Sequence, residues 1–226
     1  MEERITRRGS LVRLGGFLAA AAGVGTFEAA QEGPAAVASG AVKCVLTPEQ
    51  TEGPYYISGE KLRRNITDGH PGTRLMLHTT VVDVATCKAI PGAIVDVWHA
   101  DAAGVYSGFG TGASSRTFMR GLQRTNASGL AIFQTVYPGW YQGRTVHIHV
   151  KVHVGGNVVH TGQLYFPDSL TDAVYKKAPY SARPGRTTRN ANDSVYVNGG
   201  KNSMLGVHAD GKGGYVASIT MGVARS

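Results

Sequence analysis

Two histidines, His147 and His149, lie two residues apart in the segment 146–154, where apolar residues occupy the alternate positions. That alternation predicts a β-strand. Side chains at positions i and i+2 of a strand project from the same face, about 7 Å apart, so both imidazoles could chelate one metal ion. A solvated strand face is the plainer interpretation, since Lys151 and His153 continue the same row.

Two tyrosines near this strand could supply anionic oxygen ligands. Tyr141 ends the sequence PGWY before the strand, and Tyr106 ends the segment WHADAAGVY, which leads from an expected strand into a glycine-containing loop. A tyrosine phenol has a pKa of about 10, so a neutral structural role is the default, and only a strong Lewis acid favours the phenolate. A hard, highly charged ion such as Fe(III) is the natural partner for two phenolates and two imidazoles.

The elements that would position these side chains are mostly strands. The chain contains 31 glycines and 9 prolines in 226 residues, which argues against a helical bundle. Alternating apolar positions predict an all-β fold, a two-layer β-sandwich of mixed or antiparallel strands with long loops, and only residues 170–176 suggest a short helix. Trp98 is interpreted as a core residue. The expected strands cover residues 75–84, 93–99, 116–123, 129–137, 146–154, 158–166, 203–209 and 214–221.

The first 40 residues are typical of an export signal. Arg7 and Arg8 precede a weakly apolar, glycine-rich and alanine-rich stretch over residues 14–27, and small residues that suit cleavage follow. This order indicates a twin-arginine signal, which exports folded cargo; a transmembrane helix would need about 20 strongly apolar residues. We therefore expect a flexible leader over residues 1–40, one domain over 41–226, and a secreted or periplasmic protein with no lasting membrane contact. A disordered basic tail is the alternative.

The cysteines and the charge narrow the class of protein further. Cys44 and Cys87 are an even pair in a chain expected to be exported, which predicts one disulfide, and no Cys-x-x-Cys spacing suggests a metal site. The net charge of +8 includes no dense block of lysine and arginine, so no nucleic-acid partner is expected. A basic surface suits anionic substrates, although it is more often simply a soluble one.

Four segments of the chain form an ordered set. They are residues 52–56 (EGPYY), 98–106 (WHADAAGVY), 138–149 (PGWYQGRTVHIH) and 163–166 (QLYF). Each is weak evidence alone, but the set is specific and lies within residues 46–168. In this order the segments resemble the intradiol ring-cleavage dioxygenases, the catechol and protocatechuate dioxygenases that use non-haem Fe(III).

The resemblance implies a ligand set for one non-haem Fe(III) ion per chain. The residues at the matching positions are Tyr106, Tyr141, His147 and His149. Among them, Tyr141 would be the axial ligand that leaves when substrate chelates the metal, and Tyr106 would stay bound. The same resemblance implies the fold of this family, which agrees with the sandwich expected from the strand pattern.

The resemblance also implies a substrate side of the site. Arg144 and Gln163 match positions that face the substrate, and the arginine stabilises negative charge on its ring; Tyr55 matches a position in the pocket wall. The implied partners are catechols and O2. The implied reaction opens the ring between the two hydroxyl-bearing carbons and gives a dicarboxylic acid of the cis,cis-muconate type.

Some questions stay open at this stage. The long helical region through which catechol-type members form a dimer is not matched here, so that dimer is not expected, and neither the oligomeric state nor the preferred catechol is indicated. One alternative is a cupin-like Fe(II) dioxygenase that uses His147, His149 and either His153 or His160. The other is a non-catalytic, secreted β-sandwich binding module of the pre-albumin type, with Arg144 and the histidines on a ligand surface.

Overall fold

The structure, a computed structural model, describes residues 44–109 and 112–225. The expected export signal over residues 1–40 lies outside the described residues. The strands expected from the sequence are present, and their bounds differ from the expected ones by at most four residues. The described strands are β1 (Arg74–Asp83), β2 (Ile94–Trp98), β3 (Arg120–Arg124), β4 (Leu130–Val136), β5 (His147–Val154), β6 (Asn157–Tyr165), β7 (Gly206–Ala209) and β8 (Tyr215–Val223).

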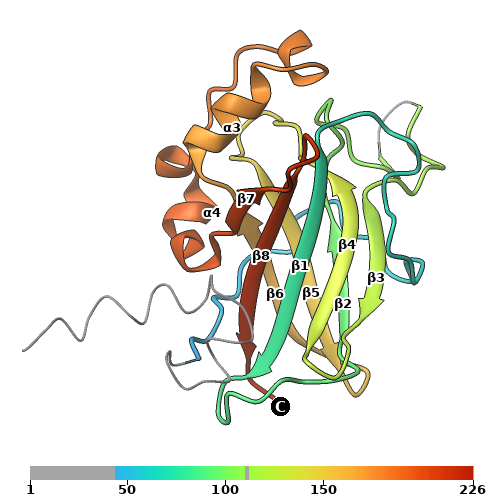
Figure 1. Cartoon of the computed structure of the whole chain (residues 1–226), viewed down its shortest axis with the longest axis vertical. Helices are drawn as coiled ribbons and strands as arrows, with labels where there is room; N and C mark the ends of the chain where they lie inside the picture. The colour runs from blue at the N-terminus through green and yellow to red at the C-terminus, as the bar shows by residue number, and fades with distance from the viewer. Residues whose placement is uncertain (1–43, 110–111, 226) are drawn as a thin grey trace, which may run out of the picture.

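These strands form two four-stranded sheets packed face to face (Figure 1). One sheet has the order β4-β1-β8-β7 and the other the order β3-β2-β5-β6. The pairing of β1 with β8 is parallel, whereas the remaining strand pairs within the two sheets are antiparallel. The predicted all-β, two-layer sandwich with mixed and antiparallel strands is therefore confirmed.

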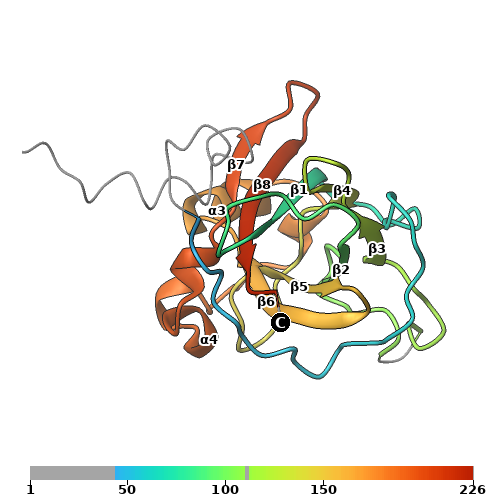
Figure 2. The same cartoon turned by 90° about the horizontal axis from the view of Figure 1, so that it is seen from below.

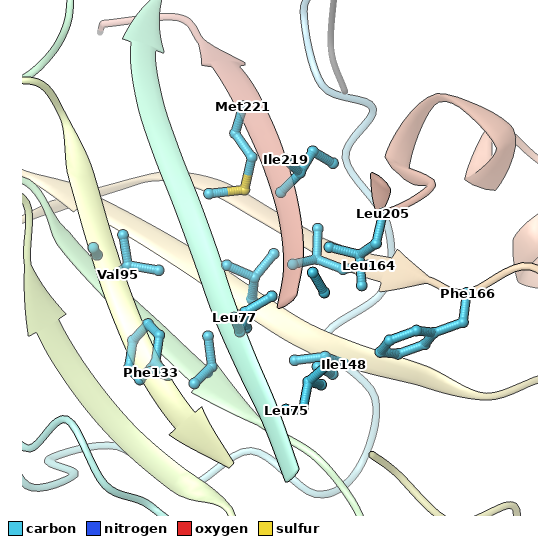
Figure 3. Packing of buried hydrophobic residues seen from close by; sticks show 14 of the residues in the cluster. Leu75, Leu77, Val95, Phe133, Ile148, Leu164, Phe166, Leu205, Ile219 and Met221 are labelled. Atoms are coloured by element: carbon cyan, nitrogen blue, oxygen red, sulfur yellow. The ribbon is translucent and has the colours of Figure 1, made fainter. Parts of the chain in front are cut away.

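The core fills the space between the sheets (Figure 3). Leu75 and Leu77 of β1 and Phe133 of β4 face Val95 of β2 and Ile148 of β5, and all five side chains are fully buried. Burial of each such side chain contributes about 1.5–3 kcal/mol to stability. Because alternate residues of a strand point to opposite faces, β5 presents its histidines on the outer face of its sheet.

The segment that precedes β1 covers this outer face. Figure 2 shows its first part following the outside of β6 and β5 before it reaches β3. The amide of Gln50 donates to the carbonyl of Thr161 in β6, and Leu62 forms an isolated bridge with Leu122 in β3. Both faces of β5 are therefore buried over most of its length.

Helical turns occupy the segment between β6 and β7, at one side of the sandwich in Figure 1. The predicted short helix is present as α3, and further turns stand where the sequence suggested only a loop. No helix in the described part of the chain is long and apolar enough to cross a membrane. The elements are α3 (Asp168–Tyr175), η1 (Tyr180–Ala182), η2 (Asn190–Asn192), α4 (Ser194–Val197) and η3 (Gly200–Ser203).

Two predicted strand starts are wrong. The strand expected from residue 116 begins at Arg120, because turns precede it and Met119 adopts a positive φ of 56°, which an extended strand does not allow. The strand expected from residue 203 begins at Gly206, because the chain first makes the η3 turn and then the amide of Leu205 bonds to Tyr165.

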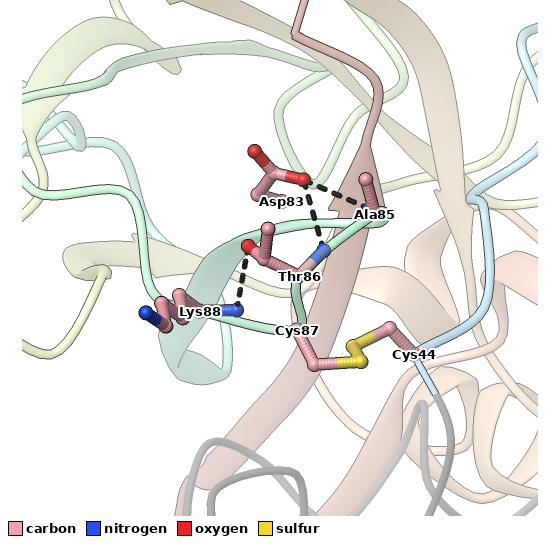
Figure 4. Close-up of a disulfide and its surroundings, with 6 residues drawn as sticks. All are labelled: Cys44, Asp83, Ala85, Thr86, Cys87 and Lys88. Carbon is pink, nitrogen blue, oxygen red and sulfur yellow. Dashed lines mark hydrogen bonds between the residues drawn. A yellow bond between two sulfur atoms is a disulfide. The ribbon is translucent and has the colours of Figure 1, made fainter.

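Cys44 and Cys87 form the predicted disulfide (Figure 4). It links the first described residue to the turn after β1, where the carboxylate of Asp83 accepts hydrogen bonds from the amides of Ala85 and Thr86 at 2.8 and 3.2 Å. Closing a loop of 43 residues stabilises the folded chain by about 4 kcal/mol in the chain-entropy model. The disulfide thus fixes the beginning of the segment that covers the histidine face.

Candidate metal centre

The structure brings together the four side chains that the resemblance implied as ligands. Nε2 of His147 lies 3.1 Å from Nε2 of His149 and 3.1 Å from the hydroxyl of Tyr141. The ring centroid of Tyr106 is 5.5 Å from that of Tyr141 and 6.1 Å from that of His149. Three segments therefore converge: strand β5, the loop after β2, and the turn that precedes β5.

A backbone carbonyl group orients the imidazole ring of His147. Its Nδ1 lies 2.6 Å from the carbonyl oxygen of Thr145, so Nδ1 carries the proton and donates it, which leaves the lone pair on Nε2. Burial, helped by the Arg144 cation, lowers the pKa of His147 to about 3. The imidazole is thus neutral near pH 7, as a metal ligand must be.

His149 is also held neutral, but by different contacts. Burial and the neighbouring His147 lower its pKa well below the usual value. Its Nδ1 is buried and has no hydrogen-bond partner among the described residues. Its ring stacks on Trp98 instead, with centroids 4.9 Å apart and an angle of 6° between the planes.

The two phenols differ in depth. Tyr106 is only 5% exposed, and its buried hydroxyl has no hydrogen-bond partner within the part of the chain that the structure describes. Burial, and secondarily Tyr141, raises the pKa of Tyr106 well above its usual value. Tyr141 is partly exposed, and burial raises its pKa too. Without a cation, both groups are therefore protonated phenols.

This donor set fits a metal ion. Two Nε2 atoms 3.1 Å apart have the separation expected of two ligands on one ion with bonds of about 2.1 Å. An unpartnered buried hydroxyl costs free energy unless something binds it, and Tyr106 has such a hydroxyl. A mixed phenol and imidazole set suits a hard trivalent ion better than a soft one.

The cupin-like alternative lacks its third histidine. No group of three or more histidine, cysteine, aspartate or glutamate side chains in the described ranges could hold a metal ion. The pairing of β5 with β6 shifts register between Val152 and His153, and His160 pairs with Val152 rather than with His149. Neither His153 nor His160 thus joins His147 and His149.

Arg144 lies beside the site in a fixed ion pair. Its Nε donates to Oδ2 of Asp193 at 2.9 Å, and its Nη2 donates to Oε1 of Gln163 at 2.5 Å. Burial acts to lower the pKa of Arg144, but the hydrogen bond and charge of Asp193, together with Tyr141 and Tyr165, outweigh it and the pKa is raised. Gln163 is anchored in turn, because its Nε2 donates to the carbonyl of Thr51 at 2.8 Å.

Asp193 is a functional neighbour that the sequence analysis missed. It is fully buried and caps α4 by accepting from the amides of Val195 and Tyr196, and it also accepts from the amide of Thr145 at 2.7 Å. Burial acts to raise its pKa, but these N–H groups and Arg144 outweigh it and hold the pKa below its usual range. An aspartate before a short helix was a visible capping signal; its partner 49 residues away was not.

A cavity opens beside the two phenols. It has a volume of about 250 Å³, and both Tyr106 and Tyr141 line it. Tyr55 stacks on Tyr106 with centroids 4.3 Å apart, so this residue lies in the cavity wall as the resemblance implied. The other lining residues are Gly104, Val105 and Phe109. The described wall is therefore aromatic and aliphatic, without a charged side chain.

The fold and the site define an all-β sandwich protein with a mixed phenol and imidazole centre. Residues 51–185 match the family model described as Dioxygenase. An intradiol ring-cleavage dioxygenase from Tetranychus urticae superposes with a TM-score of 0.77 at 35% identity, over 80% of this chain and 95% of that one. The chain belongs to the intradiol ring-cleavage dioxygenase family.

Further relatives agree with this assignment. The dioxygenase domain of a dioxygenase–carbohydrate-binding fusion from Streptomyces sp. SirexAA-E has a TM-score of 0.63 at 30% identity, over 80% of this chain and all of that one. Catechol 1,2-dioxygenase 1 of Acinetobacter lwoffii is 37% identical over 101 residues, 42% of this chain and 32% of that protein. The match to this curated relative thus spans about a third of its length.

Proposed function

We propose that this protein is a non-haem iron dioxygenase that cleaves catechol-type rings between the two hydroxyl-bearing carbons, using O2, to give dicarboxylic acids of the cis,cis-muconate type. The observation that carries the proposal is the convergence of two phenols and two imidazole Nε2 atoms beside an aromatic cavity. Family membership supports it, as do the catechol 1,2-dioxygenases among the relatives.

One Fe(III) ion per chain would be held by Tyr106, Tyr141, His147 and His149. Bound there, it would supply the Lewis acidity that favours phenolate and catecholate and the redox centre for the reaction with O2. The protein holds both imidazoles neutral in advance, so their lone pairs are free at pH 7. The two tyrosines must each lose a proton when the ion binds.

Tyr141 is suited to leave and to take a proton. It is the more exposed of the two tyrosines and lines the cavity, so an incoming diol can reach its oxygen. As a phenolate, the oxygen of Tyr141 would be able to accept the proton of one substrate hydroxyl. Tyr106 is more deeply buried and is clamped by the ring of Tyr55, so it is the tyrosine that stays.

Arg144 supplies a fixed positive charge. Asp193 and Gln163 hold its guanidinium from two sides, so it needs no reorganisation when negative charge grows on the substrate ring. A preorganised group of this kind contributes about 3 kcal/mol to transition-state stabilisation. Because Asp193 belongs to the segment between β6 and β7, that segment completes the site as well as flanking it.

The cavity wall favours uncharged substrates. A carboxylate on the ring needs a cation beside it, and the described lining residues include none; the Arg144 guanidinium lies outside this lining and is already held by Asp193 and Gln163. We therefore propose catechol and catechols with small apolar substituents, in preference to protocatechuate.

Turnover under labelled O2 tests the proposed function. The iron-loaded protein is incubated with catechol under ¹⁸O2, and the ring-opened dicarboxylate is expected to carry both labelled atoms. Absence of O2 consumption with every catechol, at one iron per chain, would refute the proposal and favour a binding module.

We also propose that the protein is exported through the twin-arginine pathway. The arginine pair and the apolar stretch behind it support this location. The disulfide supports it too, since disulfides persist in oxidising compartments.

A further inference from the structure

The two histidines of the centre are supported in different ways. Metal-binding histidines almost always donate their second ring N–H to a carbonyl, a carboxylate or water, which fixes the ring. His147 follows this rule through the carbonyl of Thr145. His149 does not, because its Nδ1 is buried without a hydrogen-bond partner in the described chain. Something else must fix the ring of His149.

Trp98 is placed to do this. It pairs with His149 across the antiparallel strands β2 and β5, so the two side chains leave the same face of the sheet side by side. Their rings are nearly parallel, 6° apart, at a centroid distance of 4.9 Å. Trp98 is 1% exposed and belongs to a small cluster with Tyr106 rather than to the main core between the sheets.

Trp98 also packs against the segment 52–56, which we call the strap. Within the strap, Tyr56 packs on the indole with centroids 4.8 Å apart. Lys151 of β5 holds the strap down, because its ammonium lies 3.8 Å from the ring centroid of Tyr56 and pairs with Glu52. The indole thus contacts both Tyr56 and His149.

The edge of His149 is closed by the same strap. A Cβ atom built on Gly53 would come within 3.2 Å of Cε1 of His149, so the backbone of the strap lies directly against the imidazole. With the indole on its face and the strap at its edge, the ring has little freedom to rotate.

We propose that Trp98 is the positioning residue of His149, and that stacking replaces the hydrogen bond that would otherwise aim its Nε2 at the metal. The proposal rests on the proposed metal site. Trp98 is not among the residues that line the cavity, so it acts through His149. Its loss frees a ring that must be fixed for the two Nε2 atoms to bind one ion.

Substitutions that separate stacking from volume test this role. Trp98→Phe keeps an aromatic face, whereas Trp98→Met fills space without one. Phe133→Met is the matched control, because Phe133 is a fully buried aromatic residue of β4, in the other sheet. Thermal unfolding of all three variants measures the general cost of the change from aromatic to methionine.

The readout is metal binding to the purified, metal-free protein, with Zn²⁺ and Fe²⁺ as probes. Loss of an outer partner of a metal ligand costs 10–100-fold in affinity, and about this loss is expected for Trp98→Met. Trp98→Phe is expected to recover most of it, and Phe133→Met to bind as the wild type does. Equal affinity in Trp98→Met and the wild type would overturn the role of Trp98.

An NMR measurement keeps the two proposals distinguishable. The ring protons of His149 are expected to be shifted upfield by the indole in the metal-free wild type and to lose that shift in Trp98→Met. An unshifted His149 in the wild type would contradict the stacking itself. A wild-type protein with the shift but without stoichiometric metal binding would refute the proposed function and, with it, the purpose of Trp98.

Discussion

The two tyrosines of the candidate metal centre differ in how deeply they are buried. Tyr106 is enclosed and covered by Tyr55, whereas Tyr141 keeps part of its surface toward the cavity. In the proposed reaction the more exposed phenol of Tyr141 would leave and accept a proton, whereas Tyr106 would stay, since it is buried and covered by Tyr55. The difference in burial therefore accounts for the different roles proposed for Tyr106 and Tyr141.

Replacement of Tyr141 by phenylalanine separates metal binding from turnover. We expect Tyr141→Phe to retain iron through the other three ligands but to lose about 10²–10⁴-fold in kcat, the usual contribution of a positioned base. Iron analysis and steady-state kinetics measure both effects. Tyr215→Phe is the control, because Tyr215 stands at the start of β8 and does not line the cavity. Full turnover by Tyr141→Phe would contradict the assigned role.

Asp193 gives the site a pH dependence in stability. Its pKa is held below the usual value, so the stability it contributes is present above about pH 4 and is lost as the pH falls through the lowered pKa. We expect Asp193→Asn to lower the free energy of unfolding by about 2 kcal/mol at pH 7, with a smaller difference at pH 3. Denaturant unfolding at both pH values measures this, and a difference that grows toward pH 3 would contradict it.

At the scale of elements, strand β5 contributes one face to the core and the other face to the candidate metal centre. Ile148 packs into the core, and on the other face His149 lies beside His147 and meets the strap. Because the core fixes the twist and register of β5, it also fixes the direction of both imidazoles. The strap then adds the second side of the site.

A pair of glycines isolates the contribution of the strap. Gly53 and Gly59 both adopt positive φ, 70° and 78°, but only Gly53 lies against His149, whereas a Cβ on Gly59 would meet nothing within 4 Å. Gly53→Ala and Gly59→Ala should each cost about 1–2 kcal/mol in stability. Only Gly53→Ala should also weaken metal binding, which a metal titration of both variants measures. Equal affinities would contradict the contact.

The sequence predicted those strands and site residues that a local pattern of residue types reveals. Alternation located β1, β4, β5 and β6, and residue type with spacing located His147 and His149. The start of β3 was missed because a turn and the positive φ of Met119 interrupt an otherwise strand-like segment. Arg144 with Asp193, and His149 with Trp98, meet only through the fold, so no local pattern could pair them.

At the scale of the whole molecule, the proposed export through the twin-arginine pathway can be tested on the arginine pair. Replacing Arg7 and Arg8 together by lysine should retain the protein in the cytoplasm, because twin-arginine export depends on that pair. Fractionation of cells that express the full chain measures this, with the wild-type chain as the reference. Unchanged export of the double variant would contradict the proposed pathway.

The most direct test of the central claim is the visible absorption spectrum of the purified protein, recorded together with its iron content. Phenolate bound to Fe(III) gives an intense charge-transfer band, so we predict a wine-red protein with one iron per chain and a band that changes when catechol is added. A colourless protein, or an iron-loaded protein whose spectrum is the same in the Tyr106→Phe and Tyr141→Phe variants, would contradict a centre built from two tyrosines and two histidines.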